Sequence, residues 1–340
     1  MAPHFSTLSV LLPVYNGATT LPAALDSLLD QTRPDFEVVA VDDGSIDDTA
    51  TILERYAQRD PRIKPIFSAH NGIVGALNLG LTHCNAPYIA RMDCDDISHP
   101  QRLERQADCL ESQTDIDLIS CRVEFPRCRA NSGYARYVDW TNHVCTPDQI
   151  RNLRFIESPF AHPSVMFRAE LVHRFGGYAA GVFPEDYELW LRWLDNGVNM
   201  AKTPETLLTW NDPPDRLSRT DPRCSTEAFY RIKAHYLAKW LQTHNPHHPD
   251  IVVWGAGRKT RQRASLLTEQ GLRIRAFIDV APNKIGRPIH GIPVWGPHDL
   301  PAPRSCFVVP LVASRGARTT IMRFLGRQGY TLGINIIPAA

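Results

Sequence analysis

The sequence predicts an α/β fold in which a mostly parallel sheet is covered by helices on both faces. Short apolar runs alternate with segments of helical periodicity, which is the pattern of a parallel sheet. Acidic motifs follow two of the apolar runs, at Asp42-Asp43 and at Asp93-Cys94-Asp95-Asp96. Ligands of such sheets bind beyond the carboxyl ends of the strands. We therefore expect the functional site at these motifs.

The first elements follow from their apolar patterns and turn residues. Leu8–Val14 is a continuous apolar run closed by Asn16-Gly17, which is typical of a buried strand and a turn. A helix with an apolar stripe beginning at Leu21 comes next. Further elements alternate in the same way. Strands are expected at 36–41, 63–67 and 88–92, and helices at 49–59 and 72–83.

The rest of the chain divides into an irregular stretch and a second α/β pattern. Between 120 and 220 two helices are predicted, at 147–153 and 187–196, and strand-like stretches flank 162–164; a long helix follows at 225–242. From Ile251 strands and helices alternate again. Strands are expected at 251–254, 274–279, 306–311 and 334–337, and helices at 261–270 and 318–328. We expect a catalytic domain over 1–222, a helix and linker over 223–249, and a smaller Rossmann-like domain over 250–340.

Composition excludes several classes of protein. The chain of 340 residues has 37 Lys and Arg against 36 Asp and Glu, a formal charge of +1. This balance argues against a protein built to grip nucleic acid. No apolar run approaches the about 20 residues needed to span a bilayer, and we expect no signal peptide. The eight cysteines form no Cys-x-x-Cys pair, so the sequence favours a reducing, cytoplasmic setting without zinc.

The strand-end carboxylates indicate metal-assisted chemistry. Asp42-Asp43, Asp93-x-Asp95 and Glu185-Asp186 are the three acidic motifs. Mg²⁺ and Mn²⁺ prefer hard oxygen ligands. Such a cation can neutralise a diphosphate leaving group, and a separate carboxylate can take a proton from an attacking hydroxyl.

Four motifs in order carry a resemblance to a known family. They are Pro13-Val14-Tyr15-Asn16-Gly17, Asp42-Asp43-Gly44-Ser45, Asn71-Gly72 followed by Ala76-Leu77-Asn78-Leu79-Gly80, and Ala90-Arg91-Met92-Asp93-Cys94-Asp95-Asp96. Over about residues 6–220 the chain resembles the family 2 glycosyltransferases of the GT-A fold. The resemblance implies a mixed, mostly parallel sheet. It also implies inverting transfer of a sugar from a nucleotide-sugar, by in-line attack without a covalent intermediate.

The resemblance assigns roles to individual residues. Those implied to bind the nucleotide-sugar are Pro13, Val14, Tyr15, Asn16, Asp42, Asn71, Gly72, Asn78, Arg91 and Asp93. Asp42 would accept a hydrogen bond from the base, and Tyr15 would pack on it. Asp95 would ligate Mn²⁺ or Mg²⁺. Asp186 would be the general base, with Glu185 supporting its loop.

Several residues keep two interpretations. Asp43 could cap a turn, and Asp96 could cap the helix that follows it. His162 faces the donor site or is a satisfied structural histidine. Trp190, one turn after Asp186, borders the acceptor site or packs in the core, whereas Trp193 is expected in the core. Arg216, with Leu217 and Ser218, contacts the diphosphate or is solvated.

The C-terminal part of the chain also keeps two interpretations. The basic, amphipathic helix at 225–242 docks on its own domain or lies on an anionic membrane. Gly255-x-Gly257 follows a strand, but Thr260 replaces the third glycine of a dinucleotide turn. Asp279, with Lys284 and Gly286, resembles the small Rossmann-like modules of sugar-modifying proteins. That module is a scaffold or docking domain, or it holds a sugar-nucleotide.

The function predicted from the sequence is therefore metal-dependent, inverting glycosyl transfer. The expected donor is a UDP-sugar, with dTDP- and GDP-sugars as alternatives, and the expected acceptor is a glycan or a lipid-linked precursor. Two rivals are a sugar nucleotidyltransferase and a non-catalytic sugar-nucleotide-binding scaffold. Expected partners include a membrane surface, touched peripherally, and a second copy or another protein docked on the C-terminal domain. No nucleic acid is expected.

Overall fold

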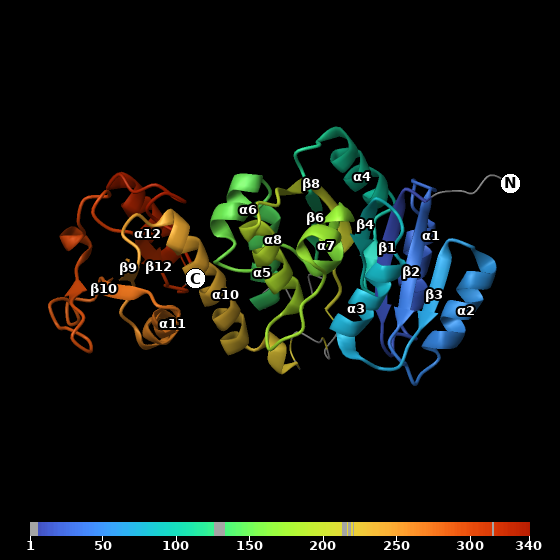
Figure 1. The fold of residues 1–340 in the computed structure, drawn as a ribbon, viewed down its shortest axis with the longest axis horizontal. Helices are drawn as coiled ribbons and strands as arrows, with labels where there is room; N and C mark the ends of the chain where they lie inside the picture. Colours follow the sequence, from blue (N-terminus) through green and yellow to red (C-terminus); the bar gives the residue numbers. More distant parts are fainter. Residues whose placement is uncertain (1–5, 126–132, 213–215, 217–218, 220, 315) are drawn as a thin grey trace. The chain divides into compact units, whose positions relative to one another are not determined.

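The computed structural model describes residues 6–125, 133–212, 216, 219, 221–314 and 316–340. They fall into two compact units, drawn in Figure 1. The first unit comprises Met1–Ile150, Pro159–Gly181 and Glu185–Thr220. The second comprises Arg151–Ser158, Val182–Pro184 and Asp221–Ala340. The long helix at 225–242, which the sequence sets apart with the linker, belongs to the second unit.

A sheet of eight strands organises the first unit. Its strands, in spatial order, are β3 (Ile63–Phe67), β2 (Phe36–Asp42), β1 (Leu8–Val14), β4 (Tyr88–Arg91), β7 (Met166–Arg168), β6 (Leu118–Glu124), β8 (Met200–Thr209) and β5 (Ile97–Ser98). The first four run parallel, whereas β7 is antiparallel to both β4 and β6. The sheet is therefore mixed, with its parallel half at the N-terminal strands.

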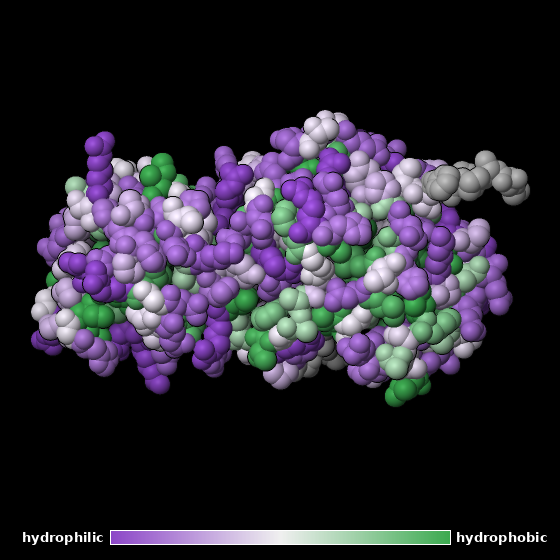
Figure 2. Space-filling model, viewed as in Figure 1, coloured by the Kyte–Doolittle hydropathy of each residue, from purple (hydrophilic) through white to green (hydrophobic). Residues whose placement is uncertain are grey.

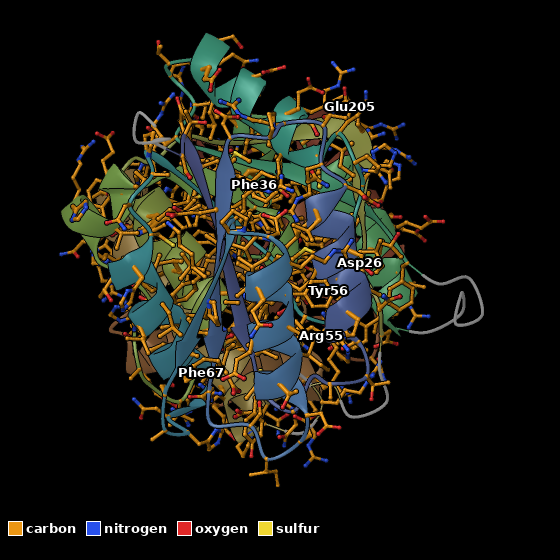
Figure 3. All side chains as sticks on the ribbon, turned by 90° about the vertical axis from the view of Figure 1, so that its right-hand side faces the viewer. Asp26, Phe36, Arg55, Tyr56, Phe67 and Glu205 are labelled. Atoms are coloured by element: carbon orange, nitrogen blue, oxygen red, sulfur yellow. The ribbon has the colours of Figure 1, made fainter. Side chains whose placement is uncertain are left out.

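Helices cover this sheet, and the apolar residues of the strands form the core between them. The helices are α1 (Leu21–Leu29), α2 (Thr49–Arg59), α3 (Gly72–His83), α4 (Arg102–Ser112), α5 (Gly133–His143), α7 (Glu170–Phe175) and α8 (Glu185–Asp195). The helix α6 (Pro147–Leu153) begins in the first unit and ends in the second. All seven residues of β1 are buried, as expected for a strand covered on both faces. Figure 3 shows Tyr56 of α2 near Asp26 of α1, and its hydroxyl donates to that carboxylate at 3.0 Å.

The second unit has a four-stranded parallel sheet. The strands, in spatial order, are β11 (Val294–Trp295), β10 (Arg273–Ile278), β9 (Asp250–Trp254) and β12 (Val308–Pro310). Its helices are α10 (Thr226–His244), α11 (Arg258–Glu269) and α12 (Ala317–Arg327). The apolar side of α10 is buried, and so is Lys233 on the same helix. Because that apolar side is covered within the second unit, it is not a face for a membrane.

The predicted fold class is confirmed, and the differences lie in particular segments. The strand expected at 334–337 is wrong, because Ile336 forms only isolated bridges to Val308 and Leu332. The strand-like stretch that follows His162–Ser164 is confirmed as β7, whereas the sequence missed β6 and β8, whose apolar runs are interrupted by polar residues. Within the described residues, no helix is both long and apolar enough to cross a membrane.

Candidate active site

The parallel strands β1, β2, β3 and β4 bring their carboxyl ends to one edge of the large sheet. Figure 3 shows Phe67, the last residue of β3, at the opposite end of the sheet from Phe36, the first residue of β2. The predicted site residues from Tyr15 to Asp96 follow these strand ends. The structure therefore gathers the four motifs at one edge.

The turn after β1 is built by hydrogen bonds to the turn after β2. Pro13 and Val14 are buried, so they shape the turn from inside. Asn16 has a positive φ of 51°, its N–H donates to Ser45 Oγ at 2.9 Å, and its Oδ1 accepts from Ile46 N at 2.9 Å. At Gly17 a Cβ would lie 3.1 Å from Cys94 Sγ. Glycine at this position thus lets the turn approach the acidic loop after β4.

Asp42 and Asp43 are both buried but have different roles. Asp42 Oδ1 accepts from Ser45 N at 3.0 Å, and within the described residues Oδ2 has no hydrogen-bond partner. Asp43 accepts from the backbone N–H groups of Asn71 and Gly72 at 2.8 and 2.9 Å. Asp43 therefore holds the start of α3, whereas Asp42 keeps an acceptor for a ligand.

His70 is a residue of this site that the sequence did not single out. Its ring stacks on Tyr15, with the centroids 4.2 Å apart, and its Nδ1 lies 2.9 Å from Asp43 Oδ2. The half-exposed Tyr15 ring, expected to pack on a base, thus has a neighbouring ring on one side. Only the fold could reveal this pair, because the two residues are 55 positions apart.

Arg91 ends β4 with a buried guanidinium that forms an ion pair with Asp93. Burial alone would lower the pKa of Arg91, but the Asp93 carboxylate outweighs burial and raises it. Within the described part of the chain, Arg91 Nε is buried without a hydrogen-bond partner. A buried, charged donor without a partner is costly, and a bound anion would satisfy it.

Asp93, Asp95 and Asp96 form a three-carboxylate cluster, with one oxygen of each within 4.8 Å of the others. Burial and the neighbouring Asp93 raise the pKa of Asp95 to about 6, and the same causes, with Asp95, raise the pKa of Asp96. Asp96 Oδ2 is buried and has no hydrogen-bond partner among the described residues. Hard oxygen donors at this spacing fit a divalent cation, which would relieve the repulsion between the three groups.

The alternative role of Asp96 as a helix cap is wrong. The residue before α4 is Gln101, and Asp96 Oδ1 instead accepts from Asn211 N at 2.8 Å. The side chain of Asn211 donates to the carbonyl of Asp95 at 2.7 Å. Asn211, which the sequence did not single out, thus binds the acidic loop to the segment after β8.

Asp186 lies in the first turn of α8, directly after the buried Glu185. Its Oδ1 accepts from Tyr187 N at 2.7 Å. Burial, followed by the charge of Glu185, raises the pKa of Asp186 to about 7. A carboxylate that takes up a proton near neutral pH can act as a general base.

His162, Tyr178 and Trp190 form a buried aromatic group near Asp186. His162 Nε2 lies 2.8 Å from Tyr178 Oη, and burial, followed by the charge of Arg91, lowers the pKa of His162. Asp186 and Arg91 also act electrostatically on the Tyr178 hydroxyl. Trp190 is fully buried against His162, Phe160 and Trp193. Trp190 is therefore a core residue, like Trp193, and the interpretation of it as a wall of the acceptor site is corrected.

Two side chains hold the backbone that carries Tyr178. Asn78 Nδ2 donates to Tyr178 O at 2.8 Å, and Asn78 Oδ1 accepts from Tyr178 N at 3.0 Å. Arg192 donates to the carbonyls of Phe175, Gly176 and Gly177 and also pairs with Glu188. Asn78, expected on the donor side, thus uses both polar atoms of its side chain to hold this turn. Arg192 was missed because an i,i+4 pair on a helix has no distinctive sequence signal.

Arg216 lies over the ring of Trp210, 3.9 Å from its centroid. Its positive charge lowers the pKa of Asp95, against the effects of burial and Asp93. The residue therefore sits where its field reaches the acidic cluster. Leu217 and Ser218, predicted to belong to the same segment, lie outside the described residues.

Sequence comparison adds to this geometry. The sequence model described as Glycosyl transferase family 2 matches residues 9–176. An O-antigen biosynthesis glycosyltransferase of Escherichia coli, WbnJ, is 30% identical over 239 residues, which cover 69% of this chain and 89% of that protein. The chain belongs to glycosyltransferase family 2.

Two further glycosyltransferases are similar to more than half of the chain. The amylovoran biosynthesis glycosyltransferase AmsE of Erwinia amylovora is 32% identical over 204 residues, 59% of this chain and 74% of that protein. A UDP-Gal:α-D-GlcNAc-diphosphoundecaprenol β-1,3-galactosyltransferase of Escherichia coli is 32% identical over 203 residues, 58% of this chain and 72% of that protein. The family assignment makes this chain a glycosyltransferase that uses a nucleotide-sugar, which removes the scaffold and nucleotidyltransferase rivals.

A solved structure supports the fold. The TarS fragment 1–349 of S. aureus, in complex with UDP-GlcNAc, matches with a TM-score of 0.55 and 19% identity, over 77% of this chain and 70% of that one. The predicted GT-A fold is thereby confirmed. Asp186 lies beyond the residues that the family model matches, so its role rests on the geometry described above.

The polar side chains beside the glycine turn of the second unit have partners within that unit. Asp279 Oδ2 accepts from Ala256 N at 3.0 Å and from Lys284 Nζ at 2.9 Å, and Oδ1 accepts from Ala281 N at 2.9 Å. Thr260 Oγ1 donates to Leu311 O at 3.2 Å. Asp279 therefore has partners for both oxygens without a ligand.

Proposed function

We propose that this family 2 glycosyltransferase is an inverting, metal-dependent enzyme that transfers a sugar from a UDP-sugar to a hydroxyl of a glycan or lipid-linked acceptor. The observation that carries the proposal is the division of the site's carboxylates. Three of them lie within 4.8 Å of one another and fit a cation. Asp186 is separate from them, with its pKa near 7.

The donor would be held at the ends of β1, β2 and β4. Asp42 Oδ2 is free to accept from a base N–H, and the Tyr15–His70 stack offers an aromatic surface beside it. Arg91 Nε, buried without a partner in the described residues, would donate to the donor's sugar or phosphate. Asp95 and its two neighbours would hold Mn²⁺ or Mg²⁺, which stabilises the negative charge of the departing diphosphate.

The transfer step is a single displacement. The acceptor hydroxyl gives its proton to the Asp186 carboxylate while its oxygen attacks the anomeric carbon. The bond from that carbon to the diphosphate oxygen breaks, and the nucleoside diphosphate leaves with the electron pair. Attack opposite the leaving group inverts the configuration of the anomeric carbon.

The substrate classes come from the relatives. One relative's name specifies UDP-Gal as donor and a sugar-diphosphoundecaprenol as acceptor, and the structural neighbour was solved with UDP-GlcNAc. Two others are named for the biosynthesis of surface polysaccharides. A UDP-sugar and a lipid-linked sugar acceptor are therefore the first substrates to test.

The test separates base catalysis from donor binding. Asp186→Asn should keep the thermal stabilisation by donor and Mn²⁺ but lose transfer by roughly 10²–10⁴-fold, measured as released nucleoside diphosphate. Asp108→Asn, an exposed site on α4, is the matched control and should transfer normally. NMR of the product should show the inverted anomer. Normal transfer by Asp186→Asn, or a retained anomer, would refute the mechanism.

A further inference from the structure

The near-neutral charge of the chain conceals a strong division between its two units. The second unit has 19 Lys and Arg against 7 Asp and Glu, a formal charge of +12. The first has 18 against 29, a formal charge of −11. Residues 300–340 contain five arginines and no acidic residue. Such asymmetry between parts of a chain points to a charged partner.

The acidic residues of the second unit are already used inside it. Four ion pairs or pair networks join Asp221 to Arg223, Glu227 and Glu269 to Arg231, Asp250 to Arg273 and Arg275, and Asp279 to Lys284. Asp299 accepts from Gly296 N, and the remaining acid, Glu157, from Ser158 N. With seven acidic residues for 19 Lys and Arg, the unit keeps a surplus of positive charge that its own carboxylates do not balance.

Exposed cations without an ion pair remain among the described residues of this unit. They are Arg258, Lys259, Arg287, Arg304, Arg323 and Arg327. Arg323 and Arg327 stand four residues apart on α12, a spacing at which like charges repel. The loop that carries Arg304 lies beside the end of this helix, because Pro303 Cγ is 3.5 Å from where a Cβ on Gly329 would be. These three arginines thus share one region of the unit.

Apolar groups lie beside these cations. Arg304 lines a groove of about 240 Å³ together with Phe307, Pro246 and Ile334. The Ile334 side chain is 64% exposed, and Val280, on another loop of the unit, is 69% exposed. On the face that Figure 2 shows, the second unit is mostly hydrophilic with isolated hydrophobic spots. Cations with scattered exposed aliphatic side chains suit an interface of phosphates and acyl chains.

We propose that the second unit is a polycationic docking module that binds the anionic lipid surface in which a lipid-linked acceptor resides. The charge argument stands by itself, but the choice of a lipid rests on the lipid-linked acceptor of the proposed function. The acidic first unit would be repelled by the same surface, so the second unit supplies the attraction. This assigns a partner to a domain whose strand-end carboxylate, Asp279, is already satisfied by its own residues.

The test measures binding of the full chain to phosphatidylcholine vesicles with and without 30% phosphatidylglycerol, by co-sedimentation. Each cation at such a surface contributes about a factor of five to the partition coefficient. Removing three, as Arg304→Gln with Arg323→Gln and Arg327→Gln, should lower it by about 100-fold. The matched control removes three exposed cations from the first unit, as Arg55→Gln with Arg105→Gln and Arg174→Gln, and should not weaken binding. Thermal unfolding checks that both variants are folded.

Salt and competing partners complete the design. Binding should fall steeply between 50 and 500 mM NaCl because the Debye length shortens, to about 3 Å at 1 M. Equal binding to both vesicle types, equal loss in the control variant, or binding to a DNA duplex but not to vesicles would each overturn the proposal. So would salt-sensitive self-association that replaces vesicle binding, since the partner would then be the acidic unit of a second copy.

A transfer assay with a detergent-solubilised acceptor distinguishes the two proposals. Transfer without vesicle binding leaves the proposed function standing and overturns the docking module. Vesicle binding without transfer leaves the docking module standing and overturns the proposed lipid-linked acceptor.

Discussion

Each unit carries a carboxylate at the end of the second strand of a parallel sheet, and the two carboxylates have different surroundings. Asp42, the last residue of β2, uses one oxygen on Ser45 N and within the described residues leaves the other without a partner. Asp279, directly after β10, has Ala256 N, Ala281 N and Lys284 Nζ on its two oxygens. Asp42 therefore keeps an oxygen that can bind a ligand, whereas both oxygens of Asp279 are already hydrogen-bonded to protein groups.

The difference teaches that topology alone does not identify a site. Leaving a buried polar group unsatisfied costs about 1–3 kcal/mol. Near Asp42, Arg91 Nε and Asp96 Oδ2 are both left in this state within the described chain. Polar groups that stay unpaired together at one strand edge indicate a bound ligand more strongly than a glycine-containing turn does.

The largest effect is expected from the acidic cluster of the first unit. Asp95→Asn removes a charged oxygen from the proposed metal site, and transfer should fall by roughly 10³-fold, the equivalent of several kcal/mol of lost charge stabilisation. The measurement is the initial rate of nucleoside diphosphate release with Mn²⁺. Asp108→Asn is again the control, and a rate for Asp95→Asn within tenfold of wild type would contradict the metal assignment.

The next effect concerns the stability of the first unit and the turn at Tyr178. Asn78→Ala removes both hydrogen bonds to Tyr178, so the free energy of unfolding should fall by about 1–3 kcal/mol. Asn85→Ala, an exposed residue with one local bond, is the control. Chemical denaturation of both variants measures the difference. Equal stabilities would show that the two hydrogen bonds from Asn78 to Tyr178 contribute nothing to the free energy of unfolding.

The pH dependence tests Asp186. Its pKa, raised by burial and by Glu185 to about 7, means that the ionised base forms only as pH rises through 7. The transfer rate at saturating substrate and Mn²⁺ should therefore fall by about fivefold between pH 7 and 6, and level off above 8. A rate that stays flat down to pH 5 would place the pKa at an ordinary value and remove the argument for this base.

The smallest effect on transfer is expected from the second unit. Asp279→Asn weakens the pair with Lys284 and replaces one accepting oxygen by an amide NH₂, so the free energy of unfolding should fall by about 1–3 kcal/mol. Transfer to a detergent-solubilised acceptor should not change. A loss of transfer comparable to that of Asp95→Asn would mean that Asp279, like the carboxylates of the first unit, takes part in transfer.

The parallel half of the fold and its motifs could be predicted from the sequence. Helices α2 and α3 and strand β3 have the expected bounds, because apolar periodicity and turn residues agree in these segments. Between 118 and 210 the strand β7 has only three residues, and β6 and β8 contain polar residues that break the pattern. Their pairing is set by the sheet, not by local propensity.

The motifs of the site could be predicted from the sequence, but which of their polar atoms are free for a ligand could not. Asp42 and Asp95 follow strands, so local sequence locates them. The partner of Asp96 is Asn211, 115 positions later, and the partner of Tyr15 is His70. No local pattern could separate the free oxygen of Asp42 from the occupied oxygens of Asp43 and Asp279, since hydrogen bonds across turns decide it.

The measurement that matters most is where the nucleotide-sugar and its metal bind, which we propose to be the strand edge of the first unit. Thermal unfolding with UDP-, dTDP- and GDP-sugars and Mn²⁺ tests this binding on wild type, Asp95→Asn and Asp279→Asn, since a ligand of the folded state raises stability. We expect stabilisation by UDP-sugars that is lost in Asp95→Asn and kept in Asp279→Asn. Stabilisation that survives Asp95→Asn but is lost in Asp279→Asn would place the nucleotide in the second unit and contradict the proposed donor site.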